Sequence, residues 1–430
     1  MKTRSIAFSS IVAVALSGCA SMVTLPPPQA APAAKAIQPA LSQSAPAVIS
    51  ATPAGPTWAS ELVVAWPKGY TGGPVGYDMA NGAKRFELPL GRADALNKLY
   101  FAALVDKDST RVKTYTLHDG AEVGSITLPG RWDVAGLSPN GLYVALAQIG
   151  TPDEQQNWIK QNTWQTHLRV LDMKRQQVKH TLDLDGNFVV EAISNDGHSL
   201  FMLENLPVAK PDHYNVRQFD LWTERMNEYP LREKGNEEVM AGYAWDALAS
   251  GDGEWLMTLY LNNNKKEAFV HALHLDYQLT VCIDLPSGDG DLERLKEYRL
   301  TLSADGKRLY AANAALGTML DIALDDTTYP PYQIVHATHF TPVTTPVGNP
   351  SLFTHSAFSP DGKTLYFTSA NTAWSYNIDT QQVSRLPVEG ALFGIGTSAD
   401  GQRVYVNREQ QLLPFDVVTG TALRFPNAAR

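Results

Sequence analysis

The stretch Phe358-Ser-Pro-Asp-Gly-Lys-Thr-Leu-Tyr-Phe367 recurs in altered form along the chain, and this recurrence decides the fold. An apolar pair such as Leu365-Tyr366 follows the glycine in most copies, and a degenerate copy lies near Asp94. The spacings between successive copies are 56, 56, 53, 56 and 39 residues, and the pattern Ser-x-Asp/Asn-Gly starts at Ser138, Ser194, Ser250, Ser303, Ser359 and Ser398. A repeat of this length indicates a solenoid, a propeller or another array of structural units.

Each copy of the motif predicts a hairpin. Asp-Gly or Asn-Gly supplies the positive φ of a tight reversal, and a Ser or Asp side chain can bond the backbone beside it. Between copies the same order returns, with a strand, a short turn and another strand, as at 372–379 and 382–388. Four antiparallel strands per unit, which we call A to D from centre to rim, predict an all-β β-propeller. A sandwich of unrelated hairpins is the alternative.

The number of blades follows from the motif strands. Together with the degenerate copy they favour seven four-stranded blades. Residues 61–89 add three short strands, which could close the ring or form part of an eighth blade. We expect one chain end to pair with the other, because an unpaired edge strand invites aggregation. Helical periodicity is nearly absent, and only 288–298 is expected to hold a short helix.

The N-terminus has the pattern of an export signal. Lys2 and Arg4 precede an apolar run at 6–16, which is too short to span a membrane and remain as a helix. Leu16-Ser17-Gly18-Cys19 matches the lipid-attachment motif of bacterial lipoproteins, in which the cysteine becomes the acylated first residue. Residues 1–18 are therefore predicted to be a lipoprotein signal peptide, and Cys19 a palmitate-bearing anchor to a membrane. An ordinary signal peptide with an incidental cysteine is the alternative.

Beyond the signal, composition divides the chain in two. Residues 19–56 are a Pro/Ala-rich linker that cannot bury a core, so we expect a lipid-anchored, disordered tether. Residues 57–430 are predicted to form the propeller domain. By analogy with enteric bacteria, the alanine after Cys19 favours the outer membrane of the cell envelope.

Charge and cysteine content restrict the partners and the disulfide bonds that we expect. Loss of Lys2 and Arg4 with the signal leaves 33 basic against 44 acidic residues, which changes the formal net charge from −9 to −11. An acidic balance without basic clusters argues against a nucleic-acid partner. With Cys19 acylated, Cys282 is the remaining thiol, so no disulfide within the chain is expected.

Two copies of the motif carry a family resemblance. Ser-Pro-Asp-Gly-Lys-Thr-Leu-Tyr-Phe at 359–367 and Ser-Ala-Asp-Gly-Lys-Arg-Leu-Tyr-Ala at 303–311 resemble the YVTN and WD40-like propeller repeats of exported bacterial proteins. The Tyr-Val-Thr-Asn string itself is only approximated, as Tyr310-Ala-Ala-Asn313. The resemblance covers about 60–426 and implies the fold, whereas such propellers serve as binders, scaffolds and enzymes alike.

The strand order predicts two unlike faces. The A–B and C–D turns lie on one face, the tight-turn face, and the B–C and D–A connections lie on the other, the long-loop face. Longer loops on a rigid scaffold are where binding residues concentrate, and the long connections are 148–166, 205–215, 261–268, 286–297 and 339–353. The candidate binding residues in them are Trp158, Trp164, His213, Tyr214 and Phe340. The alternative is that these side chains fold back and cover the blades.

Three inner-strand residues are candidates for chemistry. Asp246, Arg299 and His355 each stand four residues before the motif serine of successive units, and strand alternation places them toward the central channel. A carboxylate, a guanidinium and an imidazole could form an acid–base or anion site. A solvated ion-pair network is the alternative.

The chain carries no familiar cofactor or catalytic motif. It has no Gly-rich phosphate loop, Gly-x-Ser-x-Gly, His-Glu-x-x-His or haem-attachment sequence, so neither a cofactor nor a metal is predicted. We therefore expect a non-catalytic binding or scaffold module, anchored to the membrane, that holds a protein or glycan on the long-loop face. The alternative is a propeller enzyme, a lactonase-like hydrolase or a lyase, that uses Asp246, Arg299 and His355 at the channel mouth.

Overall fold

The computed structural model describes most of the chain after residue 60. The described residues are 61–66, 72–95, 98–161, 163–208, 210–232, 240–277, 279–324, 332–343, 355–388, 392–408, 411–417, 419, 421–423 and 425. The chain forms two units, Met1–Pro53 and Ala54–Arg430, and all the described residues belong to the second. The predicted signal peptide, Cys19 and the tether 19–56 all lie outside the described residues.

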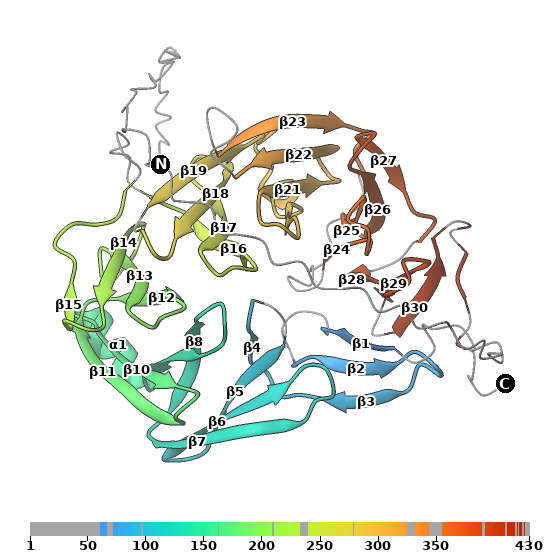
Figure 1. Cartoon of the computed structure of the whole chain (residues 1–430). Coiled ribbons are helices and arrows are strands. Elements are labelled where there is room, and N and C mark those ends of the chain that lie inside the picture. Colours follow the sequence, from blue (N-terminus) through green and yellow to red (C-terminus); the bar gives the residue numbers. More distant parts are fainter. Residues whose placement is uncertain are drawn as a thin grey trace, which may run out of the picture. The chain divides into compact units, whose positions relative to one another are not determined.

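Eight antiparallel sheets follow one another around a ring (Figure 1), and each sheet runs from an inner strand to an outer strand. In that order, blades 1 to 4 are β1 Leu62–Ala65, β2 Val75–Asp78, β3 Lys84–Glu87; β4 Arg92–Ala93, β5 Leu99–Val105, β6 Ser109–Thr116, β7 Glu122–Pro129; β8 Trp132–Leu137, β9 Tyr143–Gln148, β10 Gln165–Asp172, β11 Gln177–Asp185; and β12 Phe188–Ile193, β13 Ser199–Leu206, β14 His213–Asp220, β15 Arg225–Met226. Blades 5 to 8 are β16 Tyr243–Ala249, β17 Trp255–Asn262, β18 Glu267–His274, β19 Thr280–Leu285; β20 Arg299–Leu302, β21 Arg308–Asn313, β22 Thr318–Ala323, β23 Gln333–His339; β24 Ser356–Phe358, β25 Thr364–Ser369, β26 Thr372–Asn377, β27 Gln382–Arg385; and β28 Leu392–Thr397, β29 Arg403–Arg408, β30 Gln411–Asp416.

The β-propeller prediction is confirmed, but the favoured count of seven blades is wrong. Strands β1–β3 make a separate blade, so the ring has eight. The count from the motif missed blade 1 because this blade has three short strands and no Ser-x-Asp-Gly turn.

The motif builds the same turn in its six Ser-x-Asp/Asn-Gly copies. In blade 7 the Ser359 hydroxyl donates to Asp361 Oδ1 at 2.6 Å and accepts from the Thr364 amide at 2.9 Å. Asp361 Oδ1 also accepts from the Lys363 amide at 3.1 Å, and Gly362 adopts φ +70°. The hydroxyl of one serine therefore forms hydrogen bonds both within the turn and with the first residue of the next strand. This explains why the motif recurs along the sequence.

The ring closes at a seam between blades 8 and 1 rather than through one shared sheet. Glu61 accepts from the Ala399 amide at 2.9 Å and from the Tyr405 hydroxyl at 2.7 Å. The Asn407 side-chain amide donates to the carbonyl of Trp66 at 2.9 Å. The expected pairing of the chain ends is therefore replaced, in the described residues, by side chains that join two three-stranded sheets.

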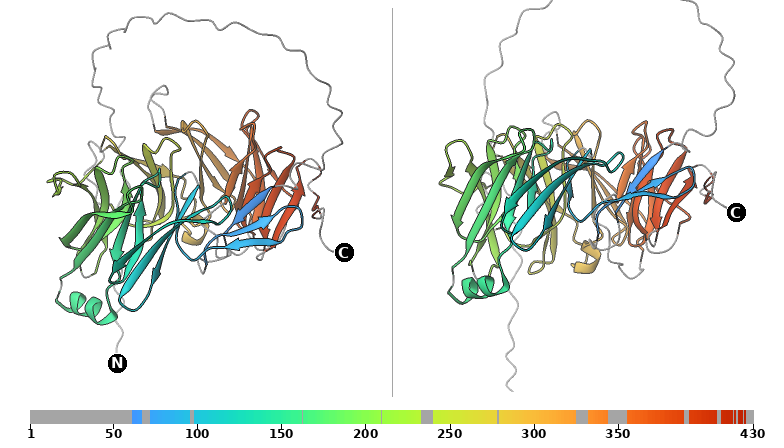
Figure 2. Two further views of the ribbon diagram at one scale, coloured as in Figure 1. Left: turned by 60° about the horizontal axis from the view of Figure 1, so that its bottom comes forward. Right: turned by 90° about the horizontal axis from the view of Figure 1, so that it is seen from below.

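Two helices leave the ring on the same side (Figure 2). The short helix expected within 288–298 is present as α2, Leu292–Leu295. The connection 148–166 was expected to be a loop, and it holds α1, Pro152–Gln161. The missed signal was a capping box, in which Thr151 Oγ1 accepts from the Glu154 amide at 3.3 Å and Glu154 accepts from the Thr151 amide at 2.7 Å.

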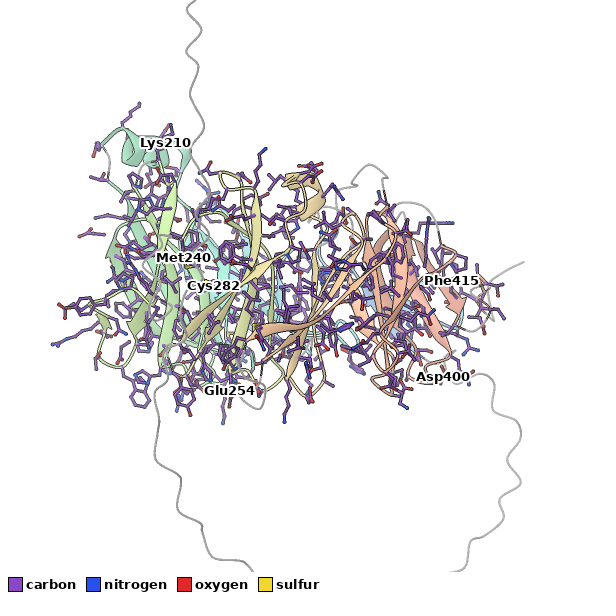
Figure 3. All side chains as sticks on the ribbon, turned by 90° about the horizontal axis from the view of Figure 1, so that it is seen from above. Lys210, Met240, Glu254, Cys282, Asp400 and Phe415 are labelled. Carbon is purple, nitrogen blue, oxygen red and sulfur yellow. The ribbon has the colours of Figure 1, made fainter. Side chains whose placement is uncertain are left out.

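The positions of the turns confirm that the two faces differ. In Figure 3, Lys210 of a B–C connection lies on the side of the helices, and Glu254 and Asp400 of A–B turns lie on the opposite side. One expectation about these faces is wrong, because long connections do not all leave from one face. The connection 324–332 joins strands C and D of blade 6 and therefore belongs to the tight-turn face.

Candidate functional site

Bulges in the inner strands change which side chains face the channel. The registers of β8, β12, β16 and β28 each shift in mid-strand, as between Val134 and Gly136 or between Ala244 and Asp246. A bulge adds one residue and breaks the strict alternation on which the prediction relied. The six positions four residues before the motif serine are all buried, and they are Val134, Val190, Asp246, Arg299, His355 and Gly394.

Asp246 and His355 do meet, although they come from blades 5 and 7. Asp246 Oδ2 lies 3.3 Å from His355 Nε2, and both side chains are buried. His355 Nε2 is also 3.0 Å from the carbonyl oxygen of Leu300, which can only accept, so Nε2 carries the hydrogen. His355 Nδ1 has no hydrogen-bond partner among the described residues. The pair spans blade 6 and joins three blades near the axis.

Arg299 does not join this pair. Its guanidinium donates to the carbonyls of Lys296 and Tyr298, each at 2.7 Å, and lies 3.1 Å from the carboxylate of Glu297. Glu297 Oε2 in turn accepts from the Ala370 amide at 2.6 Å, in the two-residue turn between β25 and β26. The pair therefore fastens blade 6 to blade 7. Sequence reasoning missed Glu297, although its position two residues before Arg299 was a visible signal.

The aromatic residues predicted on the long-loop face do not form one exposed surface. Tyr214 is buried and stacks on Tyr260, with ring centroids 5.4 Å apart. Phe340 packs on Trp374 at 4.8 Å and is half-buried. Trp164 and His213 are half-buried, and Trp158 lies on α1 with its side chain outside the described residues. His213 Nδ1 contacts Asp212 at 2.5 Å. Tyr214 and Phe340 therefore pack on blade side chains, and the binding role expected for the whole set stays a prediction.

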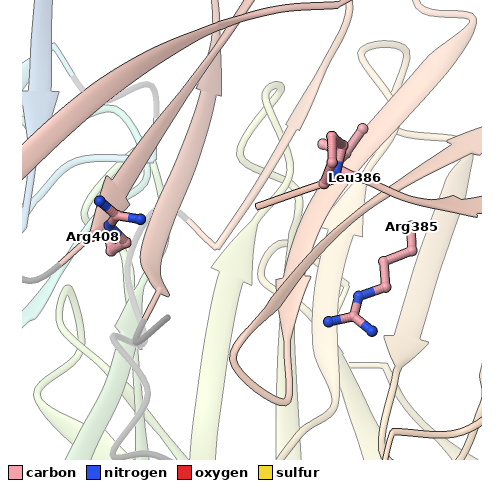
Figure 4. Close-up of a pocket in the computed structure, with 4 residues that line it drawn as sticks. Arg385, Leu386 and Arg408 are labelled. Carbon is pink, nitrogen blue, oxygen red and sulfur yellow. The ribbon is translucent and has the colours of Figure 1, made fainter. Parts of the chain in front are cut away.

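The long-loop face does carry a basic cavity. A cavity of about 470 Å³ is lined by Arg385, Leu386, Pro387 and Arg408. Arg385 ends strand β27 and Arg408 ends strand β29, so they lie at the long-loop ends of blades 7 and 8. Figure 4 shows the two arginines coming from opposite sides of the cavity. Their guanidinium groups make this cavity suited to a carboxylate or another anion.

Two of the three most exposed aromatic side chains among the described residues, Trp222 and Tyr277, lie in turns of the tight-turn face, and the third, Tyr229, follows β15. Trp222, in the β14–β15 turn, is 68% exposed and stacks on His198, with ring centroids 4.3 Å apart. His198 Nε2 lies 3.1 Å from Asp220, which also accepts from the amides of Trp222 and Thr223. The backbone hydrogen bond from Thr223 and then the His198 side chain hold the pKa of Asp220 below its ordinary value. The indole is thus held in one orientation with one ring face open.

A second exposed ring follows the same plan in blade 5. Tyr277 is 79% exposed, and His274 Nδ1 accepts from the amides of Asp276 and Tyr277, each at 3.2 Å. Burial lowers the pKa of His274. The predicted binding residues were chosen only from the long connections, so the aromatic residues of these short turns were missed.

Neither membrane helices nor metal clusters are found in the described part of the chain. No helix there is long and apolar enough to cross a membrane. The described residues contain no group of three or more His, Cys, Asp or Glu side chains placed to hold a metal. The acidic run at 289–293 is used locally, because Asp289 pairs with Arg294 at 3.0 Å and Asp291 caps α2.

Comparisons with known proteins identify the fold and no family. No protein-family model matches the chain, and no curated protein sequence matches it, so the resemblance to YVTN and WD40-like repeats rests on the quoted motifs alone. Solved structures that are similar include the dihydro-heme d1 dehydrogenase NirN, with 13% identity, TM-score 0.50, and coverage of 87% of this chain and 75% of that one. A 6-phosphogluconolactonase homologue from Bacteroides uniformis has 12% identity, TM-score 0.41, and coverage of 76% and 94%. The Swd1 propeller of Myceliophteria thermophila has 12% identity, TM-score 0.42, and coverage of 77% and 94%. At these identities the likeness shows the propeller fold and does not choose between catalytic and non-catalytic roles.

Proposed function

We propose that the protein is a non-catalytic binding module of the bacterial cell envelope, which holds an anionic group of a protein or glycan partner on its long-loop face. The observation that carries the proposal is the cavity of about 470 Å³ with Arg385 and Arg408 on it. Arginine suits such a role because its planar guanidinium can donate two parallel hydrogen bonds to one carboxylate.

The burial of the predicted catalytic residues supports the same proposal. Arg299 is engaged by Glu297 and by two carbonyls, which leaves its guanidinium in a structural role. Asp246 on β16 and His355 just before β24 are buried, and their contacts join three blades. A partner that binds outside the ring needs none of these groups.

The test measures binding of two soluble probes, poly-L-glutamate and polygalacturonate, to the full chain in detergent. Arg385→Glu with Arg408→Glu is expected to weaken binding about tenfold, because tenfold corresponds to only about 1.4 kcal/mol. The matched control reverses two charges at the tight-turn face, Lys174→Glu with Arg225→Glu. The proposal fails if neither probe binds, or if both double variants weaken binding equally. Preference for one probe assigns the partner class.

A second candidate function rests on the Asp246–His355 pair. A carboxylate 3.3 Å from an imidazole, with the other ring nitrogen unpartnered among the described residues, is the arrangement of a general base and its orienting group. The matching activity is lactone hydrolysis. Asp246→Asn and His355→Gln would abolish such turnover and leave binding at Arg385 unchanged, whereas the proposed binding module shows no turnover to lose.

The predicted attachment to the membrane is part of the proposal. Cys19 would carry the acyl chains, and residues 19–56 would separate the propeller from the lipid surface. Cys19→Ser is expected to release the protein from the membrane fraction and to prevent labelling by an alkyne analogue of palmitate. Labelling that persists in the variant would disprove the anchor, and fractionation of the labelled protein between inner and outer membranes tests the expected location.

A further inference from the structure

A buried polar cluster lies between blades 4 and 5. Its four members are Glu191 of β12, Tyr214 of β14, Tyr260 of β17 and His271 of β18. The Tyr260 hydroxyl is 2.9 Å from Glu191 Oε1, and His271 Nδ1 is 3.8 Å from the same oxygen. The ring of Tyr214 stacks on that of Tyr260, and the Tyr214 hydroxyl has no hydrogen-bond partner among the described residues. Four strands of two sheets thus direct a carboxylate, an imidazole and two phenols to one place.

Several donor atoms of the cluster have no partner. Both ring nitrogens of His271 lack a hydrogen bond within the described part of the chain, and so does Glu191 Oε2. His271 is only 1% exposed, and the Glu191 side chain is 6% exposed. Burying polar atoms without partners costs free energy, and each such atom in a folded protein asks for an explanation. An ion held by Glu191 and by one ring nitrogen of His271 would supply a partner for two of these three atoms.

We propose that Glu191, His271, Tyr214 and Tyr260 bind a ferric ion. Phenolate and carboxylate oxygens are hard donors that match a hard trivalent cation, and imidazole is an accepted ligand of iron. The same imidazole argues against Ca²⁺ and Mg²⁺, which take oxygen ligands.

The charges and distances fit this ion. Two phenolates and one carboxylate balance three positive charges, and His271 binds as the neutral imidazole. On binding, each phenol loses its proton to solvent as its oxygen forms a bond to iron. A metal about 2.1 Å from each ligand needs neighbouring donors about 3 Å apart, close to the 2.9 Å between Tyr260 and Glu191. His271 Nδ1 is 3.8 Å from the same oxygen and has to move closer when the ion binds.

The strand order places the site toward the long-loop face. Tyr214 is the second residue of β14, a C strand that starts at the long-loop face. The site therefore lies toward the long-loop end of the interface between blades 4 and 5. It is separate from the Asp246–His355 pair, because Thr258 and Tyr260 project from β17 toward blade 4 whereas Leu259, opposite Asp246, packs toward blade 6.

The test loads the full chain in detergent with Fe(III) nitrilotriacetate and removes unbound metal. We expect about one iron per chain and a visible phenolate-to-iron charge-transfer band. Tyr260→Phe is expected to abolish or shift this band, and Glu191→Gln to lower iron affinity by about tenfold or more. Tyr277→Phe, which removes an exposed phenol elsewhere, is the matched control and should leave the band unchanged.

Three outcomes would overturn the proposal. They are a colourless protein without retained iron, a band that survives in the Tyr214→Phe/Tyr260→Phe double variant, and retention of Zn²⁺ with no retention of iron. Gallium(III), a redox-inert ion of similar size, should compete for the site in the unmodified protein. This competition uses the unmodified protein, so it tests the proposal even if a variant fails to fold. If gallium does not compete with iron, the result counts against the site.

Discussion

The carboxylate of Glu297 and the guanidinium of Arg299 form an ion pair that is closed to solvent. Glu297 Oε2 and Arg299 Nη2 are 3.1 Å apart, and their side chains are 2% and 3% exposed. The same oxygen accepts from the amide of Ala370 in the neighbouring blade. The pair therefore satisfies its own charges and also fixes the spacing of blades 6 and 7.

Removing one charge of this pair should destabilise the domain strongly. Glu297→Gln leaves Arg299 buried without a counter-charge, so we expect a loss of about 3–5 kcal/mol in the free energy of unfolding. Urea denaturation of the two proteins measures it. The control is Asp289→Asn, in the exposed pair with Arg294, which should cost less than about 1 kcal/mol. Equal losses in the two variants would contradict the structural role of Glu297.

The glycine of the motif is predicted to matter through its backbone alone. A Cβ on Gly362 would meet no atom within 4 Å, yet the residue adopts φ +70°. Gly362→Ala should therefore cost about 1–2 kcal/mol, the penalty of the left-handed conformation. Gly396 also has open space around its Cα and lacks this conformation, so Gly396→Ala should be neutral or slightly stabilising. Thermal unfolding compares the two, and an equal effect of both would refute the assignment.

The carboxylates of the turns should make stability depend on pH in the acid range. Hydrogen bonds from Ser303 and then Lys307 lower the pKa of Asp305 from 3.8, and Ser359 and then Lys363 do the same for Asp361. A carboxyl group whose pKa is lower in the folded state than in the unfolded state stabilises the protein at a pH above its unfolded-state pKa. This stabilisation is lost as the pH falls through the folded-state pKa. Stability should therefore decline as the pH drops below 3.8.

The matched variants for this pH effect replace the two carboxylates by amides. Asn140 already occupies the equivalent position in blade 3, where its Oδ1 accepts from the Leu142 amide at 3.0 Å. Asp305→Asn with Asp361→Asn should therefore fold and lose less stability on acidification. Asp108→Asn, an exposed carboxylate outside the motif, is the control. The measurement is the urea midpoint of unfolding at about pH 5 and pH 2.5. Equal decreases of this midpoint in the unmodified protein, the double variant and the control would reject the explanation.

The seam should respond locally to the loss of Glu61. Glu61→Ala removes the acceptor of the Ala399 amide and of the Tyr405 hydroxyl, each a hydrogen bond to a carboxylate worth about 1.5–3 kcal/mol. We expect faster amide hydrogen exchange in β28 and β29, and unchanged exchange in β17 and β18. Uniform acceleration through all blades would mean that the ring opens as one cooperative unit.

Much of the fold could be predicted from sequence because the blades share one turn. Ser359 and its counterparts make a local network that depends on residues within five positions, so the pattern is visible in one chain. Blade 1 could not be counted in this way, since its strands turn without the serine. The formation of blade 1 depends on its packing against Tyr405 of β29 and Leu412 of β30, which lie at the far end of the chain.

The site was less predictable because side-chain direction depends on bulges. Asp246 was expected near His355, and the two do meet. Arg299 has the same spacing from its motif serine, yet it forms its ion pair with Glu297. The four-residue spacing that selected the three candidates does not select Glu297. The exposed Trp222 was missed for a related reason, since only contacts with His198 from another hairpin orient it.

The seam also determines how the domain bears mechanical load. Glu61 precedes the first strand, and its hydrogen-bond partners lie 338 and 344 residues further along the chain. Tension transmitted along the chain ahead of Glu61 therefore reaches the ring at the contact that closes it. Since β1 forms no ladder with blade 8, the link from Glu61 to that blade consists of individual side-chain bonds, whereas the Met79 amide and strand β2 hold it within blade 1. Breaking the two bonds of Glu61 across the seam leaves every strand of blade 8 paired.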